Sequence, residues 1–305
     1  MLGSSVQAPG TPRRQRRPVL LALLEAARPR QWVKNLLVLA VPTAAGVLTE
    51  GDVLRDTLAA LLAFCLASAG AYLLNDVADV DADRNHPSKR SRPVASGELP
   101  VRTALLAGAV ALVAACVVAA LVNLKLLGVV GGYVVMTTAY SRWLKHEPIF
   151  DIAAVASGFF LRAVAGGVAA DLFISKWFLI VSGGGSLFVV TAKRYAELRD
   201  DSEDARRRRP VLAAYSEDYL RAMLATAAGV TVVAYCLWCF EARSGEPPTF
   251  WTTASAVPFV LGVMRYGLLV DQGRGEEPET MLLSDRTLLG LAAACLALLA
   301  IGAAA

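Results

Sequence analysis

The stretch that decides the interpretation of this chain is Asn75–Gly97, NDVADVDADRNHPSKRSRPVASG. It directly follows an apolar run at residues 58–74, LAALLAFCLASAGAYLL. Four aspartates stand where the apolar run ends, and Lys89, Arg90 and Arg92 follow soon after. An apolar run of this kind is typical of a membrane-spanning helix, and charge of both signs at its end indicates a functional site at the membrane surface.

The composition of the whole chain predicts a helical membrane protein. Hydrophobic residues make up 56% of its 305 residues and the mean hydropathy is +0.51, which is high for a soluble domain. A spanning helix needs roughly 20 mostly apolar residues, and a lone strand cannot span because its backbone would be unsatisfied in lipid. We therefore predict an all-α polytopic protein with nine transmembrane helices. The expected segments are 32–49, 54–74, 101–122, 126–143, 149–170, 175–192, 222–240, 250–270 and 287–304.

The N-terminal residues differ in composition from the rest of the chain. Residues 1–18 are rich in Pro, Gly, Ser and Arg, which predicts a disordered basic tail. The next apolar piece, residues 19–27 (VLLALLEAA), is too short to span and is typical of an interfacial helix. Residues 19–305 are then expected to form a single transmembrane catalytic domain.

The distribution of basic residues predicts the orientation. If the N-terminus is cytoplasmic, 25 of the 30 Lys and Arg residues fall on the cytoplasmic side and 4 on the outside, and Arg162 lies within a span. Because cytoplasmic loops carry the excess of Lys and Arg, we expect the N-terminus inside and the C-terminus outside.

Several functional classes lack support in the sequence. Cys236 and Cys239 form a CxxC inside an apolar segment with no other soft ligand nearby, which favours packing over metal or redox chemistry. The chain has no zinc-binding pattern, P-loop or GxSxG motif. The basic run Arg206–Arg209 is better matched to anionic membrane lipids than to nucleic acid.

The aspartates after the apolar run have helical spacing. If the helix continues through Asp83, successive residues turn by about 100°, so Asp76, Asp79 and Asp83 share a narrow sector with Tyr72 beside them. Asp81 points roughly 140° away. Carboxylates on one face repel unless a cation lies between them, and either Lys and Arg or a Mg²⁺ ion can supply that charge. The alternative is that these aspartates form a solvated helix end and have no role in a site.

A second charged stretch follows the end of the expected span at 175–192. It reads FVVTAKRYAELRD (188–200), and Lys193 and Glu197 are four residues apart with Arg194 between them. The simpler interpretation is a salt bridge between Lys193 and Glu197 on the helix surface, without a role in a site. The consecutive Gly183, Gly184 and Gly185 in the same segment indicate close packing or local unwinding. Both charged ends are expected at the same membrane depth, which suits a substrate with a Mg²⁺-bound diphosphate and a separate phosphate.

Two further sets of residues are candidates for substrate contact. Arg30, Lys34 and Asn35 stand at the start of the first expected span, where membrane anchoring is an equally good explanation for each. Arg162 lies deep in its span between small residues, and a buried membrane arginine indicates function, usually with an anionic partner. His86 and His146 are assigned no role.

These motifs resemble the UbiA superfamily of intramembrane prenyltransferases. NDVADVDAD matches its first aspartate-rich motif, NDxxDxxxD, and the expected nine helices match its bundle around a central cavity open to the cytoplasm. Within the superfamily the chain is most similar to the decaprenyl-phosphate phosphoribosyltransferases of mycobacteria and relatives. That resemblance rests on residues 28–35, 75–93, 161–169, 175–179 and 185–198. The second aspartate-rich motif of the aromatic prenyltransferases, DxxxD, is here KRYAE, Lys193–Glu197.

The resemblance implies a reaction and its participants. The chain would transfer the 5-phosphoribosyl group from phosphoribosyl diphosphate to decaprenyl phosphate at the bacterial plasma membrane, with Mg²⁺, toward cell-wall arabinan. Asp76, Asp79 and Asp83 would bind the metal and act in catalysis with Arg162. The expected substrate-binding residues are Arg30, Lys34, Asn35, Tyr72, Asn75, Lys89, Arg90, Arg92, Arg162, Lys193, Arg194, Tyr195 and Glu197.

Two alternatives stay open from the sequence. One is an aromatic prenyltransferase of the same fold, in which the lipid carries the diphosphate. The other is a transporter or another polytopic protein without enzymatic activity, although the one-sided charge clusters disfavour alternating access. The prenyl length, the choice between Mg²⁺ and Mn²⁺ and the oligomeric state, with a homo-oligomer compatible, are also open.

Overall fold

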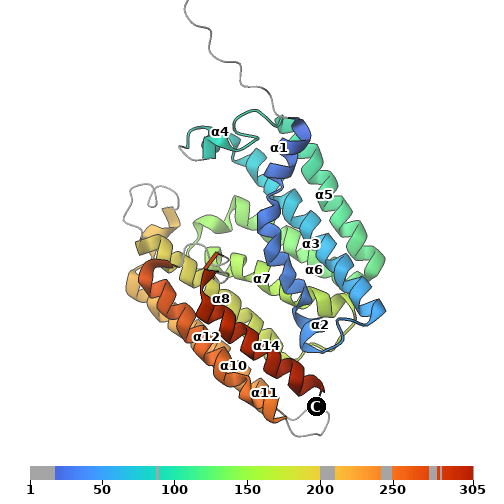
Figure 1. The fold of residues 1–305 in the computed structure, drawn as a ribbon. Helices are drawn as coiled ribbons and strands as arrows, with labels where there is room; N and C mark the ends of the chain where they lie inside the picture. Colours follow the sequence, from blue (N-terminus) through green and yellow to red (C-terminus); the bar gives the residue numbers. More distant parts are fainter. Residues whose placement is uncertain are drawn as a thin grey trace, which may run out of the picture.

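A computed structural model describes residues 18–86, 89–199, 210–241, 249–274, 280–281 and 284–304. Every regular element in these ranges is a helix, as the sequence predicts (Figure 1). The predicted tail through residue 17 and the basic run Arg206–Arg209 lie outside the described residues.

The first half of the chain forms the part of the bundle that carries the aspartate-rich motif. Its elements are α1 (Val19–Ala26), the 3₁₀ helix η1 (Pro29–Leu39), α2 (Ala40–Ala44), α3 (Gly51–Ala78), α4 (Val80–Arg84), η2 (Lys89–Ser91), α5 (Val101–Val122), α6 (Leu124–Arg142) and η3 (Leu144–His146). The second half contains α7 (Phe150–Ala169), α8 (Lys176–Arg199), η4 (Pro210–Ala214), α10 (Glu217–Phe240), α11 (Phe250–Ala254), α12 (Ala256–Leu269), the π-helical turn η5 (Val270–Arg274) and α14 (Arg286–Ala304).

The protein is a multi-pass membrane protein. Six of the described helical stretches are long and apolar enough to cross a membrane: Gly51–Ala78, Val101–Val122, Leu124–Arg142, Phe150–Ala169, Glu217–Phe240 and Phe250–Arg274. The other three expected segments fall on η1 with α2, on α8 and on α14, so the count of nine stays a prediction.

The first expected span has an unusual helical form. Residues 29–39 are a 3₁₀ helix of 11 residues, followed by 5 residues of α-helix. Because a 3₁₀ helix rises about 2.0 Å per residue and an α-helix about 1.5 Å, the two together cover roughly 30 Å, the thickness of a bilayer core. A short segment can thus reach across the membrane by tighter winding.

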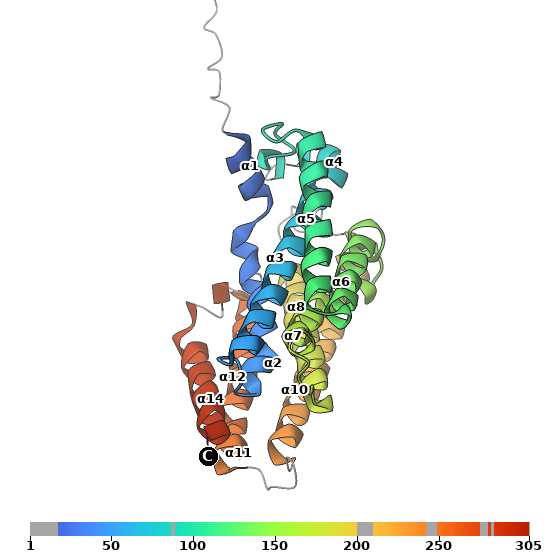
Figure 2. The same ribbon diagram turned by 90° about the vertical axis from the view of Figure 1, so that its right-hand side faces the viewer.

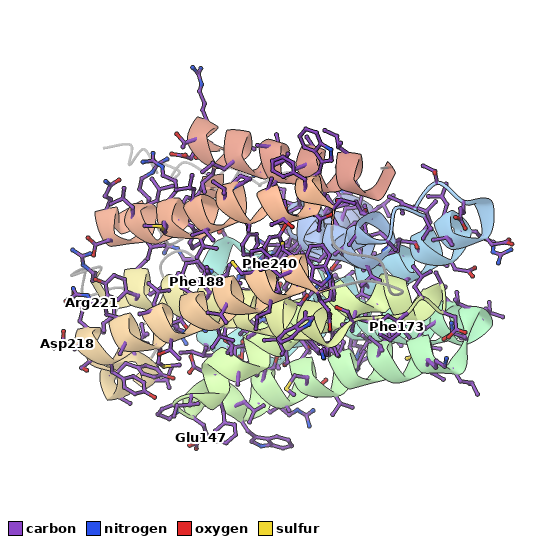
Figure 3. The ribbon with its side chains drawn as sticks, turned by 90° about the horizontal axis from the view of Figure 1, so that it is seen from below. Glu147, Phe173, Phe188, Asp218, Arg221 and Phe240 are labelled. Carbon is purple, nitrogen blue, oxygen red and sulfur yellow. The ribbon has the colours of Figure 1, made fainter. Side chains whose placement is uncertain are left out.

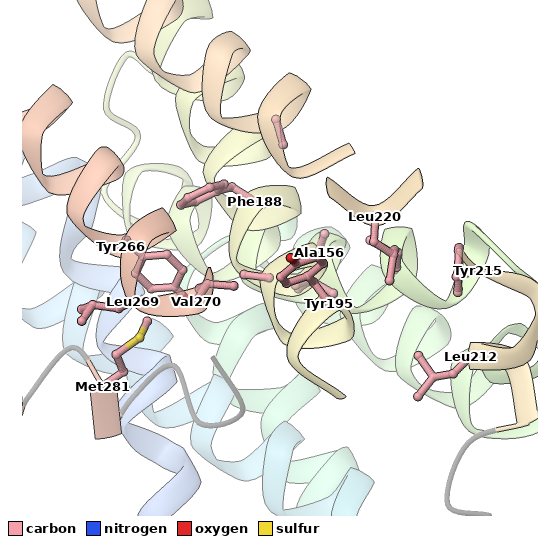
Figure 4. Packing of buried hydrophobic residues seen from close by; sticks show 14 of the residues in the cluster. Ala156, Phe188, Tyr195, Leu212, Tyr215, Leu220, Tyr266, Leu269, Val270 and Met281 are labelled. Carbon is pink, nitrogen blue, oxygen red and sulfur yellow. The ribbon is translucent and has the colours of Figure 1, made fainter. Parts of the chain in front are cut away.

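The helices pack mainly with their neighbours in sequence (Figures 1 and 2). α3 packs on α5, α6 on α7, α7 on α8, α8 on α10 and α12 on α14, while η1 packs against both α3 and α7. One apolar cluster joins α7, α8, α10 and α12, and Figure 4 shows Phe188, Tyr195 and Tyr266 within it. A second cluster joins η1 to α3, α5, α6 and α7 through many small residues, which allow close helix contact where lipid gives no hydrophobic driving force.

The main charged clusters gather at one end of the bundle. Glu147, Asp218 and Arg221 lie toward one end in Figure 3, and Phe173, in the α7–α8 connection, lies toward the other. Lys145, just after α6, contacts Asp79 at the end of α3, Arg194 at the end of α8 pairs with Asp151 at the start of α7, and Tyr195 bonds Glu217 at the start of α10. These contacts bring the five helix ends together at the charged end. The two charged stretches singled out in the sequence, at the ends of α3 and α8, are therefore on the same side of the molecule.

Gly166 creates the closest contact between η1 and α7. A Cβ atom added at Gly166 would lie 1.9 Å from the carbonyl oxygen of Val38, which is backbone and cannot rotate away. We predict that Gly166→Ala destabilises the protein by about 1–3 kcal/mol, the usual cost of overpacking. The measurement is thermal unfolding of the purified protein in detergent.

The matched control for this prediction is Gly131→Ala in α6. A Cβ at Gly131 meets nothing within 4 Å, so alanine should be neutral or should stabilise the helix by up to about 1 kcal/mol. Equal unfolding temperatures for the Gly166 and Gly131 variants would contradict the close approach of η1 to α7.

Candidate active site

The aspartate-rich motif lies where α3 gives way to α4. The helix is interrupted for one residue at Asp79, which has φ −95° and ψ 9°, so the expected continuous helix has a break there. Asp76 and Asp83 are almost fully buried, with 2% and 3% exposure, and Asp79 is half-buried. Asp81 is exposed and pairs with Arg84 at 3.1 Å, away from the buried carboxylates.

Two arginines hold the buried carboxylates. Arg28 Nη2 lies 2.6 Å from Asp76 Oδ1. Arg92 Nη1 lies 3.4 Å from the same oxygen and 2.7 Å from Asp83 Oδ2, so a single nitrogen bridges the two aspartates. Lys89 Nζ is 4.0 Å from Asp83 Oδ1. These direct ion pairs offset part of the cost of burying two carboxylates.

Asp79 has a separate set of partners. Asn75 donates from Nδ2 to Asp79 Oδ2 at 3.1 Å, and Lys145 Nζ lies 3.4 Å from Asp79 Oδ1. Lys145 comes from η3, between α6 and α7, and is 66 residues away in sequence. No sequence pattern pointed to Lys145, because its contact depends on how the α6–α7 connection folds back over α3.

Arg28 is a second residue that the sequence analysis did not single out. It stands between α1 and η1 with a positive φ of 54°, unusual for a residue other than glycine, and its guanidinium lies 4.8 Å from the ring centre of Tyr72. Arg30, the candidate named from sequence, is exposed, as is Arg90. The turn before Pro29 therefore directs Arg28 toward the carboxylates.

The donor set at the motif is compatible with Mg²⁺. Among the described residues, no three His, Cys, Asp or Glu side chains converge as a ready-made metal site. Mg²⁺ commonly takes only one or two carboxylates and completes its shell with water and substrate phosphates. Asp76 and Asp83, drawn together by Arg92, fit that pattern, and Asp79 is a nearby third oxygen donor.

Arg194 of the second motif is locked inside the protein. Its side chain is 2% exposed, and it donates from Nε to Asp151 Oδ2 at 2.8 Å and from Nη1 to Glu197 Oε2 at 3.0 Å. The sequence predicts that Arg194 and Glu197 contact substrate, and it offers no pattern that points to Asp151. Lys193, the preceding residue, is half-buried. Lys193 is therefore the better candidate for a phosphate contact on this helix.

Asp151 also binds a tyrosine from the α8–α10 connection. Tyr215 donates from its hydroxyl to Asp151 Oδ1 at 2.6 Å, and the backbone N–H of Ile149 donates to the same hydroxyl. Burial, aided by the hydrogen bond to Asp151, raises the pKa of Tyr215 well above its usual value, so the phenol stays protonated. The connections on either side of α7 and α8 are joined through this group.

Tyr195, another predicted substrate ligand, is buried and has polar partners. Its hydroxyl lies 3.2 Å from Glu217 Oε1 and 3.3 Å from Asp271 Oδ1, and it accepts a hydrogen bond from Arg221 at 3.1 Å. These contacts join α8 to α10 and η5. Tyr195 thus ties together three elements at the charged end.

Arg162 lies deeper in the bundle and its hydrogen-bond partners are neutral. Its guanidinium donates to Asn35 Oδ1 at 2.7 Å, the Gly158 carbonyl at 2.7 Å, the Tyr133 hydroxyl at 2.8 Å and the Ser68 hydroxyl at 3.2 Å. Asn35, predicted from sequence to contact substrate, is fully buried beside it. Lys34 Nζ, one residue earlier, lies 5.9 Å from the Phe159 ring centre.

Because Arg194 is buried and paired with two carboxylates, we predict that its removal destabilises the protein. Arg194→Ala leaves Asp151 buried without its cation, so we expect a loss of about 3–5 kcal/mol, as for other broken buried pairs. Arg199→Ala is the matched control on the same helix, because Arg199 is 40% exposed and its ion pairs are worth about 0–1 kcal/mol. Thermal unfolding in detergent measures both variants. A similar, small shift for the two would show that Arg194 is not a structural residue.

Comparison with known proteins identifies the family. The sequence profile of the UbiA prenyltransferase family matches residues 37–285. The chain belongs to this family. Its fold agrees with that of a UbiA homologue from Archaeoglobus fulgidus solved with GPP and Mg²⁺, with a TM-score of 0.72 and 19% identity over 93% of this chain and 98% of that one.

Relatives with higher identity carry a more specific name. A decaprenyl-phosphate phosphoribosyltransferase of Mycobacterium tuberculosis H37Rv is 42% identical over 92% of this chain and 93% of its own length. Another from Mycolicibacterium smegmatis is 41% identical over 87% of each chain. This UbiA member is therefore similar along most of its length to phosphoribosyltransferases that act on decaprenyl phosphate.

Proposed function

We propose that this UbiA-family protein transfers the 5-phosphoribosyl group from phosphoribosyl diphosphate to decaprenyl phosphate and releases diphosphate. The observation that carries the proposal is the 42% identity to a decaprenyl-phosphate phosphoribosyltransferase over 92% of this chain. The site adds chemical support, because its half-buried arginines and lysines suit two phosphorylated substrates. The product is the lipid-linked precursor of cell-wall arabinan.

The diphosphate of the donor is assigned to the aspartate-rich motif. Arg28 and Arg92 are 29% and 27% exposed. Some of their N–H groups can therefore donate to a diphosphate while the guanidinium groups remain paired with Asp76 and Asp83. Lys145, also 29% exposed, can do the same beside Asp79. Asp76, Asp79 and Asp83 would hold Mg²⁺, which when bound neutralises charge on the departing diphosphate.

The chemical step needs little from the side chains. An oxygen of the lipid phosphate attacks C1 of the ribosyl group, and the bond from C1 to the diphosphate oxygen breaks with its electron pair leaving on the diphosphate. Since a phosphate monoester has a second pKa of about 6, the nucleophile is largely ionised at neutral pH. No general base is required, and the protein contributes mainly positioning and charge compensation.

A second phosphate is assigned to the wall opposite the aspartates. Lys193 on α8 is half-buried at the charged end, and it replaces the first carboxylate of the aromatic enzymes' DxxxD motif. A cation there favours a phosphate over a second metal ion. Arg162 lies deeper, and we assign it to the interior end of the substrate site because the described structure gives it hydrogen bonds to neutral groups only.

The proposed setting is the bacterial plasma membrane, with the charged end of the bundle in the cytoplasm. A soluble, phosphorylated sugar donor must meet a lipid whose phosphate lies at the membrane surface. The charged ends of α3 and α8 would supply the two walls of such a site, and the apolar helices between them would accommodate the prenyl chain.

The aspartates give the functional test of the proposal. Asp76→Asn, Asp79→Asn and Asp83→Asn should each reduce kcat/KM by roughly 100-fold or more, because each removes a charge that orients the metal or the cations at the leaving group. The assay follows label from phosphoribosyl diphosphate into decaprenyl phosphate with Mg²⁺. Asp81→Asn is the control, since Asp81 is exposed and pairs only with Arg84 among the described contacts. Full turnover by the Asp76 variant, or in excess EDTA, would defeat the metal assignment.

The orientation gives a separate prediction. The native cysteines lie in apolar segments, so single cysteines placed at Glu147 and Asp171, both exposed at opposite ends of α7, report on its two sides. In intact cells an impermeant thiol reagent should label Asp171→Cys and should leave Glu147→Cys unlabelled until the cells are permeabilised. The reverse pattern would place the site on the wrong side for a cytosolic sugar donor.

A further inference from the structure

The short connection between α6 and α7 delivers a charge to the candidate active site. Residues 143–149 include the turn η3, from which Lys145 reaches Asp79 at 3.4 Å. Lys145 is 29% exposed, and its reach to Asp79 requires the backbone of this connection to keep its path. Something must hold the connection in place if Lys145 is to stay at the aspartates.

The backbone of this connection is strained at Ile149. Its φ of 69° and ψ of −48° are close to a γ-turn that is rare in proteins, and its β-branched side chain makes positive φ especially unfavourable. Such a conformation persists only when the surroundings fix it. The Ile149 carbonyl accepts the Ala153 N–H of the first turn of α7, and the Ile149 N–H donates to the Tyr215 hydroxyl. Of these two hydrogen bonds, the one to Tyr215 comes from a distant segment of the chain.

The Tyr215 hydroxyl is itself held in one orientation. Because an ionised carboxylate only accepts, the phenol must donate its single proton to Asp151, which leaves its lone pairs to accept the Ile149 N–H. Asp151 is fully buried and is fixed in turn by Arg194 at 2.8 Å. Tyr215 is 6% exposed and belongs to the same apolar cluster as Leu212 and Leu220, which Figure 4 also labels.

We propose that Tyr215 is a positioning residue: held by Asp151 and Arg194, it fixes the backbone at Ile149 and so presents Lys145 to Asp79. This chain of contacts connects the α8–α10 connection to the aspartate-rich motif on α3, although neither Tyr215 nor Asp151 touches the aspartates in the described contacts. The functional consequence rests on the proposed donor site, while the structural consequence does not.

Tyr215→Phe is the test variant because it removes one oxygen and keeps the buried ring. Tyr219→Phe is the matched control, since Tyr219 stacks on Tyr215 with ring centres 6.1 Å apart but is 43% exposed. Both are prepared as the full chain in detergent, and unfolding temperatures are measured to show that the variants remain folded.

The first measurement needs no substrate. Backbone amide exchange of residues 144–149 should become roughly tenfold faster in Tyr215→Phe, as expected for the loss of one restraining hydrogen bond, and should not change in Tyr219→Phe. Unchanged exchange in Tyr215→Phe, or faster exchange spread evenly over the whole bundle, would overturn the proposal.

The second measurement asks whether the effect passes through Lys145. Tyr215→Phe should raise the KM for phosphoribosyl diphosphate several-fold with a smaller change in kcat, and should have no further effect in a Lys145→Met background. Equal effects in both backgrounds would show that Tyr215 does not act through Lys145 and would overturn the proposal. If the wild-type chain does not use phosphoribosyl diphosphate at all, the proposed function fails, and the exchange experiment alone decides the positioning claim.

Discussion

The structure around the candidate site depends on the pairing of buried Asp76 and Asp83 with Arg28 and Arg92. Two carboxylates taken out of water at a membrane face are costly unless cations meet them directly. Those cations come from separate segments, the α1–η1 junction and the residues after η2, so the ion pairs also fix these segments against the end of α3. This electrostatic requirement places α1, the first expected span and the loop after α4 around the same point.

Exposure separates the cations that can serve a substrate from those that hold the fold. Arg194 is 2% exposed and is engaged by two carboxylates, whereas Arg28 and Arg92 are 29% and 27% exposed beside their carboxylates. A guanidinium that is partly open to solvent can share its donors with a phosphate without leaving its buried partner. The same chemical group therefore has a structural role at the end of α8 and a proposed binding role at the end of α3.

The sequence predicted the parts of this account that depend on local pattern. Long apolar runs identified the helices, and helical spacing separated Asp81 from the buried Asp76 and Asp83. Contacts between distant segments were not predictable. Asp76 pairs with Arg28 and not with the expected Arg30. Asp79 pairs with Lys145, and Arg194 pairs with Asp151. Each of these pairs joins residues more than 40 positions apart, and no periodicity encodes such pairings. The 3₁₀ form of η1 was also not evident, since its apolar pattern alone does not distinguish it from an α-helix.

In the proposed reaction the diphosphate belongs to a sugar donor, and the lipid phosphate is the nucleophile. The most direct test incubates the purified protein and Mg²⁺ with labelled phosphoribosyl diphosphate and decaprenyl phosphate, and in parallel with a labelled prenyl diphosphate and an aromatic acid. We expect a lipid-linked pentose phosphate in the first reaction and no prenylated aromatic product in the second. Product in the second reaction alone would contradict this expectation and would identify an aromatic prenyltransferase.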